Sequence, residues 1–151
     1  MNNFIELDLK FARDFNKRFT TFRQIEMQQI GSGSFEYSSE AFALLRDVEL
    51  CYAIRAYFAC ILLAHSIIEI HLRKVEGMKG NAVELFKKAG ISDEVEWLRK
   101  LRNDIAHGNT NQEITYAVDE EISIIWEEYC VRAFRFMHDL PVRLCRADND
   151  G

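Results

Sequence analysis

Apolar side chains recur at helical spacing through the first part of the chain. They stand at Phe4, Leu7, Phe11, Phe15, Phe19 and Phe22. Steps of three and four residues place such side chains on one face of a helix, and no Gly or Pro interrupts residues 4–30. The pattern therefore predicts one long amphipathic helix over residues 4–30, followed by a flexible connector at Gly31–Ser34.

A second long helical stretch, with room for a bend, is predicted from Glu40 to Glu76. Ser38 or Ser39 supplies the hydroxyl that caps its start. Its apolar side chains share one face when each residue is advanced by about 100°; they are Ile54, Tyr57, Phe58, Ile61, Ile68, Leu72 and Val75. Gly77 and Gly80 then end the stretch, as a left-handed cap and a loop would.

Two shorter helices are predicted next. The first covers Asn81–Ala89 and is stopped by Gly90. The second covers Asp93–His107, and either Ser92 or its own first residue caps it. Acidic residues in its first turn and Gly108 just past its end are typical of helix termini.

The last helix is expected from Asp119 to about Leu140, where Pro141 should stop it. A polar loop at Gly108–Gln112 precedes this helix, and the polar tail Arg146–Gly151 is expected to fray. The fold class that follows is all-α. The 151 residues fit a single domain, a bundle of about five helices in an up-and-down arrangement.

Composition supports this fold and narrows the function. Hydrophobic residues make up 48% and charged residues 28%, so the chain can bury a core, and one Pro with 7 Gly is too few for a many-turned β fold. The formal charge of −5 argues against a protein that coats nucleic acid, whose affinity comes from phosphate neutralisation. A single local basic groove stays compatible with that charge.

The cysteines and the apolar stretches indicate the compartment. None of Cys51, Cys60, Cys130 and Cys145 forms a Cys-x-x-Cys pair, and free thiols in a reducing cytosol are expected. If Cys51 and Cys60 share a helix, nine residues put them about 180° apart, which prevents a shared metal. Polar residues break the longest apolar stretch, Tyr57–Ile70, so no membrane span and a cytoplasmic location are predicted.

The predicted helix Asp93–His107 carries the candidate chemistry. Its apolar residues share the face expected to contact the core: Trp97, Leu98, Leu101 and Ile105. The face turned away from the core collects polar residues around the small Ala106: Arg99, Arg102, Asn103 and His107. Asn103 and His107 are one turn apart and therefore neighbours. Gly108 lets another backbone or a ligand approach this end of the helix closely.

The run Leu101–His107, Leu-Arg-Asn-Asp-Ile-Ala-His, resembles the signature of the HEPN superfamily (higher eukaryote and prokaryote nucleotide-binding). That signature is Arg, a polar residue, a few further residues and then His. The segment Ile61–Glu69 also resembles the second helix of the family. The likeness covers the helical pattern over most of the chain, whereas the sharp motif covers seven residues.

The resemblance implies a metal-independent endoribonuclease, of the kind found in toxin–antitoxin or phage-defence systems. It implies that Arg102 stabilises the phosphate of an RNA substrate and that His107 acts as base or acid. Asn103 would orient His107 or the phosphate. The residue types suit that chemistry, since an imidazole of pKa about 6.5 moves protons at neutral pH and a guanidinium clamps phosphate oxygens. No cofactor is expected, and no metal, because no ligand cluster shares one face.

The resemblance also implies partners. Such domains dimerise so that two motifs face each other across a two-fold axis, and a homodimer supplies two motif histidines where one chain supplies one. A toxin of this kind has an antitoxin or nucleotidyltransferase partner. In toxins silenced by adenylylation, Tyr follows the motif His by two residues; here that place is Asn109, which argues against silencing by that route.

Of the polar residues outside the motif, Glu69 keeps two interpretations. Glu69 is a candidate supporting residue together with Arg73 and Arg99, or it forms only a solvated ion pair with Arg73, four residues away. His65 is expected to be a hydrogen-bonded core residue. His71 and His138 have no partners at useful spacing, and Trp97 and Trp126 are read as core.

Three functions remain open from the sequence. The leading one is the endoribonuclease, which the intact set Arg102, Asn103 and His107 favours. The alternative is a non-catalytic HEPN-like module that binds a nucleotide or a partner protein, which the acidic overall charge favours. The third is a plain helical interaction domain.

Overall fold

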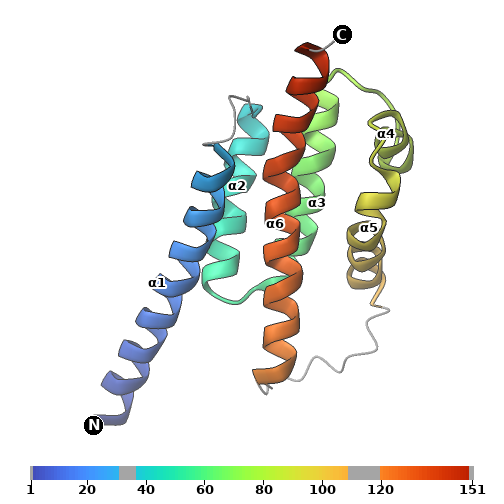
Figure 1. Ribbon diagram of the computed structural model, residues 1–151. Coiled ribbons are helices and arrows are strands. Elements are labelled where there is room, and N and C mark those ends of the chain that lie inside the picture. The colour runs from blue at the N-terminus through green and yellow to red at the C-terminus, as the bar shows by residue number, and fades with distance from the viewer. Residues whose placement is uncertain (1, 31–36, 109–119, 150–151) are drawn as a thin grey trace.

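The computed structural model describes residues 2–30, 37–108 and 120–149, and these residues form helices joined by turns, without strands. The helices are α1 (Asn2–Ile30), α2 (Ser39–Ala53), α3 (Tyr57–Lys74), α4 (Ala82–Lys88), α5 (Ser92–His107) and α6 (Glu120–Asn149). The all-α prediction is confirmed for this part of the chain. Six helices replace the predicted five, and the five longer ones alternate in direction along the chain (Figure 1).

The predicted helix from Glu40 to Glu76 is wrong, because the chain reverses at residues 54–56 and forms α2 and α3 instead. Arg55 occupies the left-handed region there, with φ of 66°. No Gly or Pro marks the reversal in the sequence. Packing explains it, since α2 and α3 lie side by side and bury apolar faces against each other; the thiol of Cys60 lies 3.8 Å from the carbonyl oxygen of Val48.

The core lies where α1, α2 and α3 meet α6. Phe22 of α1 packs edge-on against Phe134 of α6, with ring centroids 4.8 Å apart. Tyr52 of α2 packs against the same ring at 5.1 Å. On the other side of α3, the predicted core residue Leu98 of α5 is fully buried. α3 therefore connects the main bundle with the α4–α5 pair (Figure 1).

Helix ends follow the sequence signals in most places. Ser38 caps α2 by accepting a hydrogen bond from the Ala41 amide at 3.2 Å. Gly108 ends α5 in the left-handed conformation, with φ of 67°. The predicted cap of α5 is wrong: its N-cap is Ile91, without a side-chain bond, and Ser92 is already the first helical residue. Acidic side chains in the first turn of α5 stabilise that end through the helix dipole instead.

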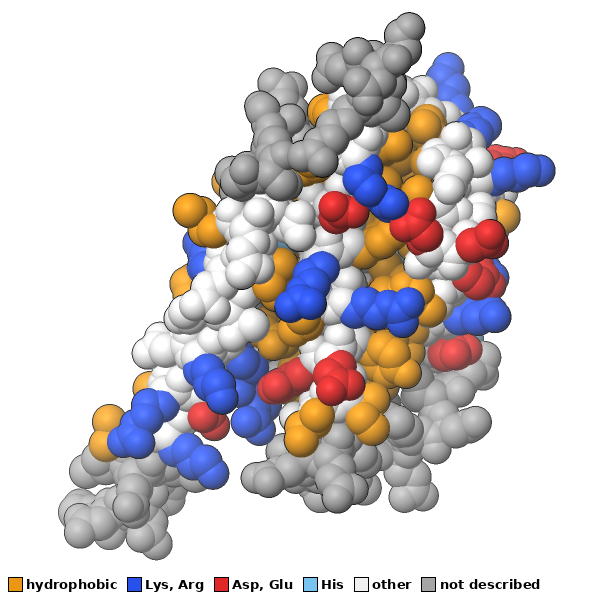
Figure 2. Space-filling model, in the orientation of Figure 1, with side chains coloured by type: hydrophobic (Ala, Val, Ile, Leu, Met, Phe, Trp, Pro, Cys, Tyr) orange, Lys and Arg blue, Asp and Glu red, His pale blue; other side chains and the backbone are white. Residues whose placement is uncertain are grey.

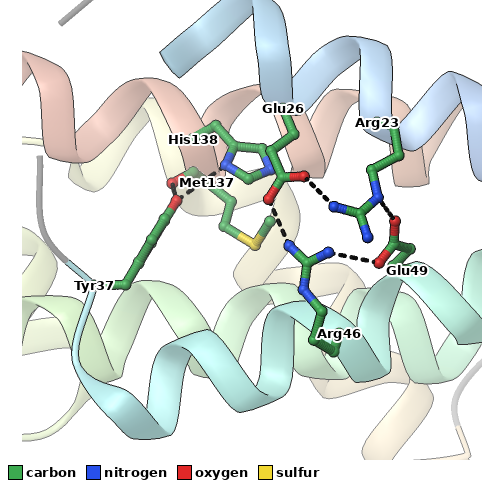
Figure 3. A network of polar contacts seen from close by, with 7 residues as sticks. All are labelled: Arg23, Glu26, Tyr37, Arg46, Glu49, Met137 and His138. Atoms are coloured by element: carbon green, nitrogen blue, oxygen red, sulfur yellow. Dashed lines mark hydrogen bonds and ion pairs between the residues drawn. The ribbon is translucent and has the colours of Figure 1, made fainter. Parts of the chain in front are cut away.

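The predicted end of the last helix at Pro141 is also wrong. Pro141 lies inside α6, which continues to Asn149. A proline leaves the carbonyl four residues earlier without its helical donor, here the carbonyl of Met137. The hydroxyl of Tyr37 donates to that oxygen at 3.2 Å (Figure 3). The connector Gly31–Ser34 and the predicted loop beyond Gly108 lie outside the described residues.

A ring of ion pairs joins α1 to α2 beside this contact (Figure 3). Arg46 pairs with Glu26 at 2.6 Å and with Glu49 at 2.8 Å. Arg23 pairs with the same two carboxylates. Burial nevertheless raises the pKa of Glu49, because desolvation outweighs the attraction of both arginines.

The surface carries little that marks a membrane or a metal site. The N-terminal half of α1 extends beyond the other helices, where Leu9 and Phe11 are exposed and Lys and Arg side chains gather (Figures 1 and 2). None of the helices in the described part of the chain is long and apolar enough to cross a membrane. Cys51 and Cys60 stand on α2 and α3 rather than on one helix, and none of the four cysteines forms a disulfide.

Candidate functional site

A groove of about 690 Å³ lies between α3, α4 and α5. It brings together five of the six predicted site residues: Glu69 and Arg73 from α3, and Arg99, Arg102 and Asn103 from α5. His65 and the N-terminal turn of α4, residues 81–84, complete its lining. The sixth predicted residue, His107, does not line the groove.

On the α3 side, three polar side chains stand one turn apart and bond in sequence. Nδ1 of His65 lies 2.9 Å from Oε1 of Glu69, and Oε2 of Glu69 lies 2.8 Å from a guanidinium nitrogen of Arg73. The hydrogen bond with His65, helped by the charge of Arg73, lowers the pKa of Glu69 against the opposing effect of burial. Glu69 is therefore ionised at neutral pH. Both interpretations of Glu69 apply, since it pairs with Arg73 and also lines the groove.

His65 is buried, as predicted, and it is also part of the groove lining. Only 2% of the residue is exposed, and its ring packs edge-on against Phe86 at 5.4 Å. Its Nε2 has no hydrogen-bond partner among the described residues. A buried polar atom without a partner costs about 1–3 kcal/mol, so this nitrogen is an unusual feature of the groove.

On the α5 side, the arginines differ in how their charge is compensated. Arg99 forms a two-point ion pair with Glu96, at 2.7 and 2.8 Å. Arg102 instead donates a 3.0 Å hydrogen bond to the amide oxygen of Asn103. Within the described residues, Arg102 makes no ion pair, whereas Arg73 and Arg99 both do. The positive charge of Arg102 is therefore the one in the groove left for an anionic ligand.

His107 is exposed at the last position of α5. It follows Asn103 by one turn, about 6 Å along the helix axis. The amide oxygen of Asn103 accepts its hydrogen bond from Arg102, so the structure does not show the predicted orientation of His107 by Asn103. A His107 side chain can serve this groove only by reaching over the last turn or by coming from a second copy of the chain.

The structure contains buried polar groups that sequence reasoning missed. Tyr37 contacts His138 as well as the Met137 carbonyl, with its hydroxyl 3.1 Å from Nδ1 of the histidine (Figure 3). Nε2 of His71 lies 3.2 Å from the Glu76 carboxylate. The i,i+3 pairs Arg23–Glu26 and Arg46–Glu49 of the ion-pair ring are visible in the sequence, but nothing there joins one pair to the other.

A second pocket, of about 460 Å³, is lined by Tyr52 of α2 and by residues of α6, and it includes none of the predicted site residues. The described residues contain no group of three or more His, Cys, Asp or Glu side chains that could hold a metal ion. Trp126 is buried, and Trp97 packs against the core with the guanidinium of Arg132 4.0 Å from its ring centroid, so neither is a free stacking platform.

No family model matches the chain, and no curated protein or solved structure matches it significantly. The resemblance to the HEPN signature therefore depends on Arg102, Asn103 and His107 and on the helical pattern around them.

Proposed function

We propose that the chain is a metal-independent endoribonuclease of the HEPN type, acting as a homodimer. The observation that supports this most is the groove itself. Arg102 brings a positive charge without an ion-pair partner among the described residues into a groove of about 690 Å³, which Asn103 and two further arginines also line. Such a local basic groove can hold RNA even though the whole chain has a formal charge of −5.

The proposed chemistry assigns one task to each motif residue. Cleavage through the 2′-hydroxyl builds negative charge on the phosphate, which Arg102 compensates. Asn103 keeps the guanidinium of Arg102 in place through the 3.0 Å hydrogen bond. His107 moves a proton at the reacting oxygens. Because His107 stands outside the groove lining, a second copy of the chain that places its α5 end beside the groove would complete the site.

The biological setting is proposed on the same resemblance. A ribonuclease with this motif fits a toxin–antitoxin or phage-defence system in the cytoplasm, with an antitoxin or nucleotidyltransferase as its protein partner. The genes that neighbour its own would test this setting directly, because a paired nucleotidyltransferase or defence gene would support it.

The deciding experiment compares three single variants with the wild type in an RNA cleavage assay with chelator present. His107→Ala should lower the rate by about 10²–10⁴ by removing proton transfer. Arg102→Ala should raise the barrier by about 3 kcal/mol. Arg13→Ala, an exposed arginine on α1, is the matched charge control and should cleave like the wild type.

Thermal melts separate chemistry from folding in the same set. Arg102 is half-buried and His107 exposed, so both variants should stay within about 1 kcal/mol of wild-type stability. Leu98→Ala, at a fully buried position, should lose about 2–5 kcal/mol. The nuclease proposal fails if wild type and both site variants cleave equally, or if cleavage requires added Mg²⁺ or Mn²⁺.

One observation favours the alternative of a binding module. His107, the residue with the proton-transfer role, does not line the groove that holds the other five residues. If a dimer forms but no RNA is cleaved, and nucleotides bind with an affinity that Arg102→Ala abolishes, the groove is a nucleotide-binding site without catalysis.

A further inference from the structure

We propose that His65, held by Glu69, is the proton acceptor of the groove, and that its Nε2 receives the proton of a ribose 2′-hydroxyl. The inference rests on the proposed function, because it names the group that acts on the substrate in that same groove. From the sequence, His65 is predicted to be a hydrogen-bonded core residue.

The contact with Glu69 settles which nitrogen of His65 carries the proton. Oε1 of Glu69 lies 2.9 Å from Nδ1, and an ionised carboxylate can only accept a hydrogen bond. Nδ1 must therefore be the donor, and in the neutral ring the lone pair is on Nε2. A carboxylate that fixes the tautomer and orientation of an imidazole prepares it to accept a proton.

The position of His65 points to a ligand. Its Nε2 is buried and has no hydrogen-bond partner among the described residues, as is also true of ring nitrogens of His71 and His138, but His65 is the histidine that belongs to the groove lining. His71 and His138 are equally buried, but neither lines the groove. A hydroxyl that entered the groove and donated to Nε2 would satisfy the buried acceptor.

Charged groups from three helices line the same groove as His65. Glu69 and Arg73 come from α3, Glu84 from the first turn of α4, and Arg99 and Arg102 from α5. Glu84 is engaged in the cap of α4, where its carboxylate accepts from the Asn81 amide at 3.0 Å. A phosphate held by Arg102 would place the neighbouring 2′-hydroxyl within the same groove as His65.

In the proposed reaction, His65 accepts one proton and His107 supplies one. The 2′-hydroxyl gives its proton to Nε2 of His65, its oxygen bonds to phosphorus, and the bond from phosphorus to the 5′-oxygen breaks. The leaving oxygen takes a proton from the His107 imidazolium, which leaves a 2′,3′-cyclic phosphate and a 5′-hydroxyl. Water then returns the proton from His65 to His107. The two histidines thus act as base and acid.

The test uses a variant that keeps the bond to Glu69. In His65→Asn, the side-chain amide can still donate to Glu69 from the place of Nδ1, but nothing replaces Nε2. His71→Asn is the matched control, since His71 is on the same helix, is equally buried and lies outside the groove lining. Cleavage should fall by about 10²–10⁴ in His65→Asn and, per folded molecule, stay at the wild-type rate in His71→Asn.

A second measurement does not depend on cleavage. Nitrogen NMR of the imidazoles is followed while adenosine 3′-monophosphate or its 2′-deoxy counterpart is added to the wild-type protein. We expect the Nε2 signal of His65 to shift with the ribonucleotide and to stay in place with the deoxynucleotide.

The outcomes separate this inference from the proposed function. If wild type cleaves RNA and His65→Asn cleaves equally well, the nuclease stands and the role of His65 is overturned. If wild type does not cleave but Nε2 responds only to the ribonucleotide, the nuclease fails and His65 remains the acceptor of the hydroxyl. If Nε2 responds to both nucleotides alike or to neither, the role of His65 is overturned.

Discussion

At the scale of single residues, three of the four histidines are buried and only His107 is exposed. Burial lowers the pKa of both His71 and His138 to about 4, because the interior disfavours the charged ring. Both rings are therefore neutral in the folded protein at neutral pH. Their ordinary pKa of about 6.5 returns on unfolding, so protons bind more readily to the unfolded chain.

This difference predicts that acid destabilises the fold between about pH 6.5 and 4. The free energy of unfolding falls as the pH decreases through that window, because His71 and His138 bind protons in the unfolded state but not in the folded state. The loss for His138 alone should be about 2 kcal/mol between pH 7 and pH 5. Glu49 acts in the opposite sense, since its raised pKa makes protonation favour the folded state and offsets part of the loss. Urea unfolding at pH 7, 6 and 5 measures the slope.

Two variants identify the source of that slope. His138→Gln removes one titrating group and should flatten the dependence by about the loss given above for His138. Asn16→Gln, at an exposed position without a titrating group, is the control and should leave the slope as it is. An unchanged slope in His138→Gln would show that His138 is not the group that titrates.

The sequence could predict the groove residues only in part. Spacing places Arg99, Arg102 and Asn103 together on one helix face, because residues three and four apart are neighbours. It cannot tell that Glu69 of another helix faces them, since that depends on how α3 and α5 pack. The place of His65 in the groove lining could not be predicted for the same reason, because a buried imidazole within an apolar run gives the same pattern whether or not it lines a groove.

At the scale of elements, two of the errors in helix prediction have tertiary causes. The reversal at residues 54–56 carries no Gly or Pro, and α2 and α3 separate because each buries a face on the other. The helix α6 passes Pro141 because Tyr37, far away in the sequence, binds the carbonyl that the proline leaves free. Local sequence signals were sufficient where a neighbouring residue itself ends the helix, as Ser38 does for α2 and Gly108 does for α5.

The reversal yields a prediction at Arg55, whose φ of 66° is unfavourable for any residue with a Cβ. Arg55→Gly and Arg55→Ala both lose the 3.5 Å contact with Asp14, which is an exposed pair of little energetic value. Only the Gly variant relieves the strain, so it should be about 1 kcal/mol more stable than the Ala variant despite the freedom Gly adds to the unfolded chain. Denaturant unfolding of the two proteins measures the difference. Equal stabilities would mean that the turn does not hold this residue in the left-handed region.

The contact at Pro141 yields a second prediction, tested by a double-mutant cycle. Tyr37→Phe leaves the Met137 carbonyl without a donor and should cost about 1–3 kcal/mol. In the Pro141→Ala background, the new amide can donate to that carbonyl. The cost of Tyr37→Phe should therefore be smaller there, by at least about 0.5 kcal/mol. Tyr129→Phe, at a half-buried ring on the same helix, serves as the control and should show no coupling with Pro141→Ala. Additive costs for Tyr37→Phe and Pro141→Ala would contradict this account of how α6 passes the proline.

At the scale of the whole molecule, the net charge and the groove favour binding of RNA at one local site over binding along a broad surface. The formal charge of −5 works against attraction of RNA to the molecule as a whole. Of the three arginines that line the groove, Arg73 pairs with Glu69 and Arg99 pairs with Glu96, whereas Arg102 makes no ion pair among the described residues. A single phosphate is the anion that such a site can hold, which suits a nuclease that cuts one bond rather than a protein that coats RNA.

The proposed dimer can be tested through the separation of Arg102 from His107. Only Arg102 lines the groove, so a composite site would take Arg102 from one chain and His107 from the other. Arg102→Ala and His107→Ala should each be inactive alone, whereas a mixed dimer of the two regains one of its two sites. Equal amounts that assort at random should therefore recover about a quarter of wild-type cleavage. Sedimentation must first show dimers at micromolar concentration, and each variant mixed with itself should stay inactive. Mixed dimers without recovered cleavage would place Arg102 and His107 of one chain in the same site, and a protein that stays monomeric would remove the composite site altogether.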